Sequence, residues 1–139
     1  MDGHRDMFSV QEQSEVAKRV AEIVRPLGLK VMALGRVALF YRYGLGGLSK
    51  DVDLHPYPMG TVDILALHDV LETAMSTQGG RIEWMADGRG LLLHYPFHER
   101  SMPVELILGG EGWIQEEGLE DAVRTGKEID GILVPSDEH

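Results

Sequence analysis

Residues 50–57 have the sequence KDVDLHPY, in which polar and apolar side chains alternate. Asp51, Asp53 and His55 occupy the polar positions, and this period of two predicts a strand with one polar face. Acids at positions i and i+2 of a strand project from the same face, roughly 6 to 7 Å apart at the backbone. We therefore expect the two carboxylates to converge on one cation. A solvated face of an edge strand is the alternative for this pair.

A third carboxylate, Glu105, lies in another apolar stretch, PVELIL at residues 103–108, which we expect to form a strand. Burying ionised carboxylates without a partner is costly, so a cation should compensate them. The 139-residue chain contains no cysteine, so a metal would be held by carboxylate, imidazole or backbone oxygen. This ligand set suits hard cations such as Mg²⁺. A merely exposed glutamate is the alternative for Glu105.

A turn that suits a phosphate precedes the acidic pair. Residues 29–34 (LKVMAL) form a short apolar run that predicts a buried strand ending at Gly35, and residues 36–43 predict a short helix. A strand that leads directly into a helix presents free backbone N–H groups, which favour an anion. The glycine-rich loop at residues 44–49 is not a P-loop, because no Gly-Lys-Ser/Thr sequence follows in the required order.

The rest of the chain alternates predicted helices and strands. Ser9 and Glu12 form a capping-box pair ahead of apolar residues at helical spacing, which predicts a helix at residues 10–25. The turn sequence at residues 87–90, Asp-Gly-Arg-Gly, predicts a hairpin. This order of elements indicates an α/β or α+β fold, a sheet with helices packed against it. The other expected elements are a helix capped by Thr61 and ending near Thr77, hairpin strands at residues 81–86 and 91–96, a helix at residues 112–124 and a strand at residues 128–134.

Composition and charge limit the classes of function. A length of 139 residues with 43% hydrophobic and 26% charged residues predicts one folded domain, and the absence of long apolar runs predicts a cytoplasmic protein without membrane spans. The net charge of −10 argues against a general nucleic-acid binder. Residues 111–139 carry most of this charge, however. The nearly balanced remainder can still receive a phosphate-bearing ligand.

At this point the chain resembles the minimal nucleotidyltransferase superfamily. The signature of that superfamily is a small-residue turn after a strand, then Asp-hydrophobic-Asp-hydrophobic, then a third acid on a later strand. Leu34-Gly35, Asp51-Val52-Asp53-Leu54 and Glu105 match it. The sequences LGRVALFYRYG and SKDVDL, with the closing GKEIDGILVPSDEH, are most similar to the AbiEii-type toxin group of bacterial nucleotidyltransferases. The resemblance covers roughly residues 10–137 and implies a nucleotidyltransferase-like mixed β-sheet.

The resemblance also implies a reaction and its site. A nucleoside monophosphate would move from an NTP to an RNA or protein acceptor, with Asp51 and Asp53 holding two Mg²⁺ ions. Glu105 would complete the metal site on the acceptor side and act as general base. As a toxin, the protein would have an antitoxin partner. The candidate substrate contacts are Gly35, Arg36, Ser49 and Lys50.

Departures from the signature keep two other functions open. Arg36 stands where the signature expects Gly or Ser, and Gly47 stands where an arginine is often found. Arg36 either adds positive charge at a triphosphate or blocks the phosphate site. The alternatives are therefore a non-catalytic binding or interaction module that retains the fold, and a small-molecule nucleotidyltransferase of the aminoglycoside-modifying kind.

The closing residues suggest that the functional unit extends beyond a single domain at residues 1–139. Ser136, Asp137 and Glu138 follow an apolar strand and have the chemistry of a helix start. We therefore expect residues 1–139 to be an N-terminal catalytic lobe that lacks a C-terminal helical region. A second copy of the chain covering the exposed sheet, as in a homodimer, is the alternative.

Overall fold

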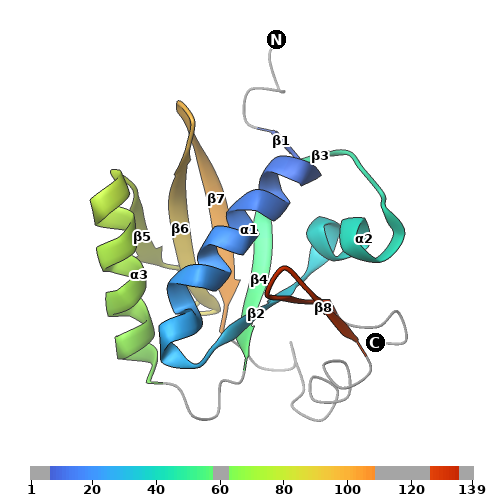
Figure 1. Ribbon diagram of the computed structural model, residues 1–139. Coiled ribbons are helices and arrows are strands. Elements are labelled where there is room, and N and C mark those ends of the chain that lie inside the picture. Colours follow the sequence, from blue (N-terminus) through green and yellow to red (C-terminus); the bar gives the residue numbers. More distant parts are fainter. Residues whose placement is uncertain (1–6, 58–62, 109–125, 135–139) are drawn as a thin grey trace.

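The computed structural model describes residues 7–57, 63–108 and 126–134, which form a seven-stranded mixed sheet with helices packed on it (Figure 1). The strand order is β5-β6-β7-β4-β2-β9-β8, and β1 and β3 form a separate two-stranded sheet. The predicted fold class, an α+β sheet with helices, is confirmed. The elements are β1 (Phe8–Ser9), α1 (Val10–Val24), the 3-10 helix η2 (Arg25–Leu27), β2 (Lys30–Ala33), α2 (Gly35–Tyr43), β3 (Leu48–Ser49), β4 (Val52–Tyr57), α3 (Ile64–Gln78), β5 (Arg81–Trp84), β6 (Gly90–Phe97), β7 (Arg100–Ile107), β8 (Lys127–Ile129) and β9 (Ile132–Val134).

The sheet is mixed around its central strand, β4. β4 pairs with β2 in the antiparallel sense and with β7 in the parallel sense, so segments distant in sequence become neighbours. β2 in turn pairs with β9 in the parallel sense. The register between β4 and β7 sets Asp53 opposite Glu105. The topology therefore brings the two predicted acidic strands side by side.

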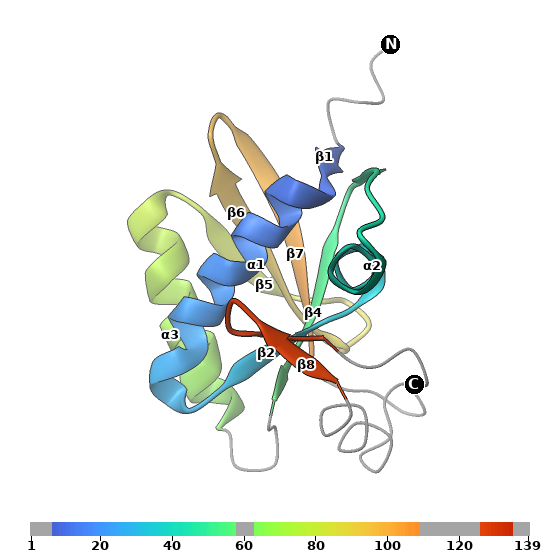
Figure 2. The same ribbon diagram turned by 45° about the vertical axis from the view of Figure 1, so that its right-hand side comes forward.

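Helices α1 and α3 lie together across one face of the sheet (Figures 1 and 2). α1 begins at the predicted capping box, in which Ser9 and Glu12 bond each other's backbone N–H groups. Its apolar side faces the core because valines recur at helical spacing. The core under both helices comprises, among others, Val16, Val20, Val24, Leu54, Leu67, Leu71, Met75, Leu91, Leu93, Val104 and Leu106.

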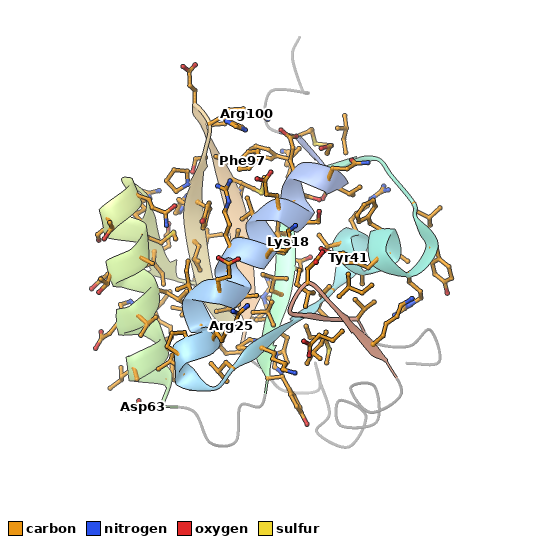
Figure 3. All side chains as sticks on the ribbon, in the orientation of Figure 1. Lys18, Arg25, Tyr41, Asp63, Phe97 and Arg100 are labelled. Atoms are coloured by element: carbon orange, nitrogen blue, oxygen red, sulfur yellow. The ribbon has the colours of Figure 1, made fainter. Side chains whose placement is uncertain are left out.

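Helix α2 starts directly after β2 and is seen end-on beside β4 in Figure 2. It ends at Gly44, whose φ of 70° lies in the left-handed region that glycine enters without steric cost. Tyr41 points from α2 back towards α1 (Figure 3), where its hydroxyl bonds Ser14. This contact fixes α2 against the helical layer.

Several element boundaries differ from the sequence-based prediction. The single strand expected at residues 128–134 is wrong: β8 and β9 form a hairpin, in which Asp130 (φ 54°) and Gly131 (φ 82°) have the positive φ values of a tight hairpin turn. β7 begins at Arg100, three residues earlier than expected. α3 is capped by Asp63, whose side chain accepts from the N–H of Leu65.

Two predicted segments, the helix at residues 112–124 and the closing residues 136–138, lie outside the described residues, as does Thr61. No helix in the described ranges is long and apolar enough to cross a membrane.

Candidate active site

The three predicted carboxylates meet on the face of the sheet opposite α1 and α3. Val52 and Leu54 are buried under the helices, so the side chain of Asp53 between them projects from the other face. Glu105 projects from the same face, because it lies opposite Asp53 in the parallel pair. Its carboxyl is within hydrogen-bonding reach of both Asp53 and Asp51. The structure thus brings the whole predicted acidic set together.

The crowding of these carboxyl groups perturbs their protonation. Burial raises the pKa of Asp53, and the negative charge of Asp51 raises it further. Burial is also the largest cause that raises the pKa of Glu105, to about 7, with the charges of both aspartates adding to it. Such a cluster is costly when fully ionised and is stabilised by any cation that enters it.

The sequence does not predict one positively charged residue of the site, Arg89. Arg89 lies 3.1 Å from a carboxylate oxygen of Glu105 and 2.7 Å from one of Asp87. The Asp-Gly turn predicts the hairpin that carries Arg89, but only the pairing of β6 with β7 shows that the turn ends beside Glu105. Arg89 lowers the pKa of both Asp53 and Glu105, against the larger effect of burial.

The predicted phosphate turn lies directly beside the carboxylates. Gly35, the first residue of α2, has a φ of 59°, and a Cβ at this position would lie 3.4 Å from Oδ2 of Asp53. The N–H of Leu34 donates to the carbonyl of Asp53 at 3.0 Å. The first N–H groups of α2, which have no partner within the helix, are therefore held next to the acidic cluster.

The other predicted substrate contacts surround the loop that leads to Asp51. Arg36 donates to the carbonyl of Gly46 at 3.4 Å, and a Cβ on Gly47 would lie 2.8 Å from its guanidinium. The hydroxyl of Ser49 donates to the carbonyl of Asp51 at 3.4 Å, and Lys50 is exposed. In this structure Arg36 and Ser49 thus contact the protein's own loop.

His55 continues the polar face of β4 but contacts no carboxylate that the structure describes. Its ring is 3% exposed, and Nδ1 lies 2.7 Å from the carbonyl oxygen of Ile107. Burial lowers the pKa of this histidine, which favours the neutral ring with Nδ1–H donating to the carbonyl. His55 therefore links β4 to β7 just beyond the acidic pair.

A groove of about 520 Å³ opens beside Glu105, on the side away from α2. Its walls include Leu92 and Pro103, and its far end holds a pair in which Nε2 of His94 lies 2.5 Å from Glu83. Among the described residues that line it, Arg89 is the only cation of permanent charge. The site thus has two sides, a helix N-terminus at Asp53 and a groove at Glu105.

A separate group of ligand atoms lies on the exposed side of α3. Atoms of His68, Asp69 and Glu72 are within 4.8 Å of one another, and within the described ranges no other set of three such residues satisfies this limit.

No protein-family model and no curated protein matches this chain. Two solved structures are similar to it. One is an antigenic nucleotidyltransferase-like protein from Paracoccidioides brasiliensis, with 21% identity over 92% of this chain and a TM-score of 0.56. The fold is nucleotidyltransferase-like. The other is a tRNA-processing enzyme, with 19% identity over 91% of this chain and a TM-score of 0.50. The chain spans only 61% and 30% of these two proteins, respectively.

Proposed function

We propose that this chain is the catalytic domain of a nucleotidyltransferase, which moves a nucleoside monophosphate from an NTP to a hydroxyl of an acceptor. The observation that carries the proposal is the meeting of Asp51, Asp53 and Glu105 on one face of the sheet, beside the N-terminus of α2 at Gly35. The similarity of the fold to that of a nucleotidyltransferase-like protein supports it.

The residues of the acidic cluster fit Mg²⁺. All three offer carboxylate oxygens, which Mg²⁺ prefers as ligands. Burial, with the charges of neighbouring carboxylates adding to it, raises the pKa of Asp53 and of Glu105, and a bound cation would offset both effects. Asp51, Asp53 and Glu105 would hold the metal. Bound Mg²⁺ would neutralise charge on the triphosphate and on the attacking oxygen.

The chain's own residues bind and orient the two substrates. Free N–H groups at the start of α2 receive the phosphates of the donor, next to Asp53. The acceptor oxygen forms a bond to the α-phosphorus of the NTP, the bond from that phosphorus to the β-phosphate oxygen breaks, and pyrophosphate leaves. The proton of the acceptor hydroxyl passes to the carboxylate of Glu105.

The acceptor would bind in the groove beside Glu105, because α2 occupies the other side of the cluster. The sequence resemblance to AbiEii-type toxins favours RNA or protein as the acceptor, with an antitoxin as partner. The groove itself supports the small-molecule alternative. Arg89 is the one permanent cation among its described lining residues, and it is already paired with Asp87 and Glu105. Transfer assays with labelled NTP and each class of acceptor distinguish these alternatives.

Calorimetry with Mg²⁺ and each NTP tests the proposal. We expect saturable NTP binding that requires the metal and that disappears when the metal is chelated. A folded protein that binds no NTP at millimolar concentration would contradict the proposal.

That negative result would favour the non-catalytic module. Arg36 is the observation on its side, because it occupies the first turn of α2 where a phosphate would lie, and its guanidinium contacts Gly46. Replacing Arg36 with Gly tests whether its side chain assists or obstructs: weaker NTP binding means that it assists, and tighter binding means that it obstructs.

A further inference from the structure

Gln13 is a fully buried polar residue on the otherwise apolar inner side of α1. Its exposed fraction is 0%, and its neighbours along this side are valines and alanines. A buried amide requires partners, because a buried polar group left unpaired loses its hydrogen bonds to water without replacement. The position of those partners therefore indicates why glutamine stands here.

Both bonds from the Gln13 amide go to the backbone that carries Asp51. Nε2 donates to the carbonyl of Ser49 at 3.3 Å and to the carbonyl of Asp51 at 3.2 Å. Two carbonyl acceptors fix the orientation of the amide, since the opposite flip would set oxygen against oxygen. Oε1, in contrast, has no partner within the described part of the chain.

Asp51 depends on these bonds more than Asp53 does. Asp53 lies within β4, where it pairs with Glu105 of β7 and its carbonyl accepts from the N–H of Leu34. Asp51, in contrast, lies between the end of β3 and the start of β4. Its backbone carbonyl is held by Gln13 and by the hydroxyl of Ser49, at 3.2 and 3.4 Å. Within the described part of the chain, no strand pairing fixes Asp51.

The start of α1 provides a rigid anchor for the loop. The N–H of Val10 donates to the carbonyl of Gly47 at 3.3 Å, and β1 pairs with β3. Arg100, at the start of β7 and labelled in Figure 3, lies over the ring of Phe8 at 3.9 Å and donates to the carbonyl of Met7. Residues 47–49, which precede Asp51, are therefore connected directly to α1 and β1. Through β1 they are also connected to β7, the strand that carries Glu105.

We infer that Gln13 is a positioning residue for the first metal-binding carboxylate: it sets the place of Asp51 relative to Asp53 and Glu105. This inference rests on the proposed function. Gln13 is not the most stabilising residue for this position, since its Oε1 is buried and has no partner among the residues that the structure describes. Removing the amide should therefore damage metal binding more than folding. A displacement of about 1 Å at a reacting group can cost on the order of 10²-fold in rate.

The test compares Gln13→Met with Gln11→Met. Methionine has nearly the shape of glutamine and no N–H donor, and Gln11 is an exposed position on the same helix. Binding of Mn²⁺ alone, followed by electron paramagnetic resonance, reports the metal site, and denaturant unfolding reports the fold. We expect Gln13→Met to weaken Mn²⁺ binding at least tenfold and to lower kcat more than it raises the KM for NTP. Its unfolding midpoint should change little, and Gln11→Met should match the wild type throughout.

The outcomes separate this inference from the proposed function. Wild-type affinity for Mn²⁺ in a folded Gln13→Met protein overturns the positioning role alone. A wild-type protein that binds neither Mn²⁺ nor NTP overturns the proposed function and the role of Gln13 with it. If Gln13→Met does not fold, Gln13→Asn withdraws the amide by one methylene and retains a polar group, and the same affinity criterion applies to it.

Discussion

At the scale of single residues, Asp53 is the carboxylate most firmly built into the sheet. Replacing it with Asn removes one negative charge from a cluster in which burial and Asp51 already raise its pKa. We expect Asp53→Asn to abolish Mg²⁺ binding and transfer. In metal-free buffer it should raise the free energy of unfolding by on the order of 1 kcal/mol, which corresponds to a rise of a few degrees in the unfolding temperature. Calorimetry and thermal unfolding measure the two effects.

Asp69→Asn is the matched control for Asp53→Asn, because Asp69 belongs to the exposed His68–Asp69–Glu72 group on α3. It should leave Mg²⁺ binding unchanged. Loss of Mg²⁺ binding in Asp69→Asn, with binding retained in Asp53→Asn, would move the metal site to α3. A loss of stability in Asp53→Asn with unchanged metal binding would show that the acidic pair is structural.

Glu105 predicts how stability depends on pH in the absence of metal. Its pKa is raised in the folded state to about 7, so its ionised form is less favourable there than in the unfolded chain. Its stabilising contribution is fully present below pH 4.5 and is lost as the pH rises through about 7. The loss is on the order of 2 kcal/mol and is shared with neighbouring groups.

Urea unfolding between pH 4 and 8 in the presence of a chelator measures this loss. In Glu105→Gln the free energy of unfolding should fall less as the pH rises. Adding Mg²⁺ to the wild-type protein at pH 8 should recover the stability that it loses without metal. Glu83→Gln should retain the decline, because bonding to His94 lowers the pKa of Glu83 and its titration has the opposite sign. A Glu105→Gln profile parallel to that of the wild type would refute the assignment.

The sequence predicts site residues that belong to a local pattern and misses those that depend on register. Asp51 and Asp53 are found from alternation, and Glu105 from an acid within an apolar strand. Arg89 and Gln13 reach the site only through contacts distant in sequence, with Arg89 bonding Glu105 and Gln13 bonding the backbone at Asp51. No local pattern contains such pairings.

At the scale of elements, the helix caps supply a test that does not involve the site. The side chain of Asp63 accepts from the N–H of Leu65 at 2.9 Å, at the start of α3. Asp63→Ala should destabilise the protein by about 1 kcal/mol, and transfer should not change because α3 lies on the opposite face of the sheet from the carboxylates. Denaturant unfolding and a transfer assay check both parts. Glu72→Ala, inside the same helix, should not destabilise.

Boundaries are where element prediction fails. The capping box at Ser9 gives the start of α1 correctly, because its two residues, Ser9 and Glu12, are only three positions apart in the sequence. The sequence does not predict the β8–β9 hairpin, because the strands on either side of its Asp-Gly turn at residues 130–131 have three residues each and are too short to show alternation. Likewise β1 and β3 have two residues each, and they are recognisable as strands only because they pair with each other.

At the scale of the whole molecule, the donor and acceptor sides can be separated by filling the groove. Leu92 lines the groove and lies opposite Glu105 across the β6–β7 pair. Leu92→Trp should raise the KM for the acceptor at least tenfold, whereas the affinity for NTP with Mg²⁺ should stay within a factor of two. Steady-state kinetics with varied acceptor measures the first quantity, and calorimetry the second.

Leu65→Trp adds the same bulk at an exposed position of α3 and serves as the control. It should leave both constants unchanged. If Leu92→Trp weakens NTP binding and not the acceptor KM, the groove is the donor side and the proposed orientation is reversed.

The interleaved order of the sheet has a consequence for biosynthesis. β4 lies between β2, which is made before it, and β7, which is made about fifty residues after it. A nascent chain that has exposed Asp51 and Asp53 still lacks the neighbouring strand with Glu105, and β2 has no partner on its other side until β9 emerges. Such non-local pairings fold slowly. An enzyme with this topology would stay inactive on the ribosome and become active only after nearly all of the sheet has been synthesised.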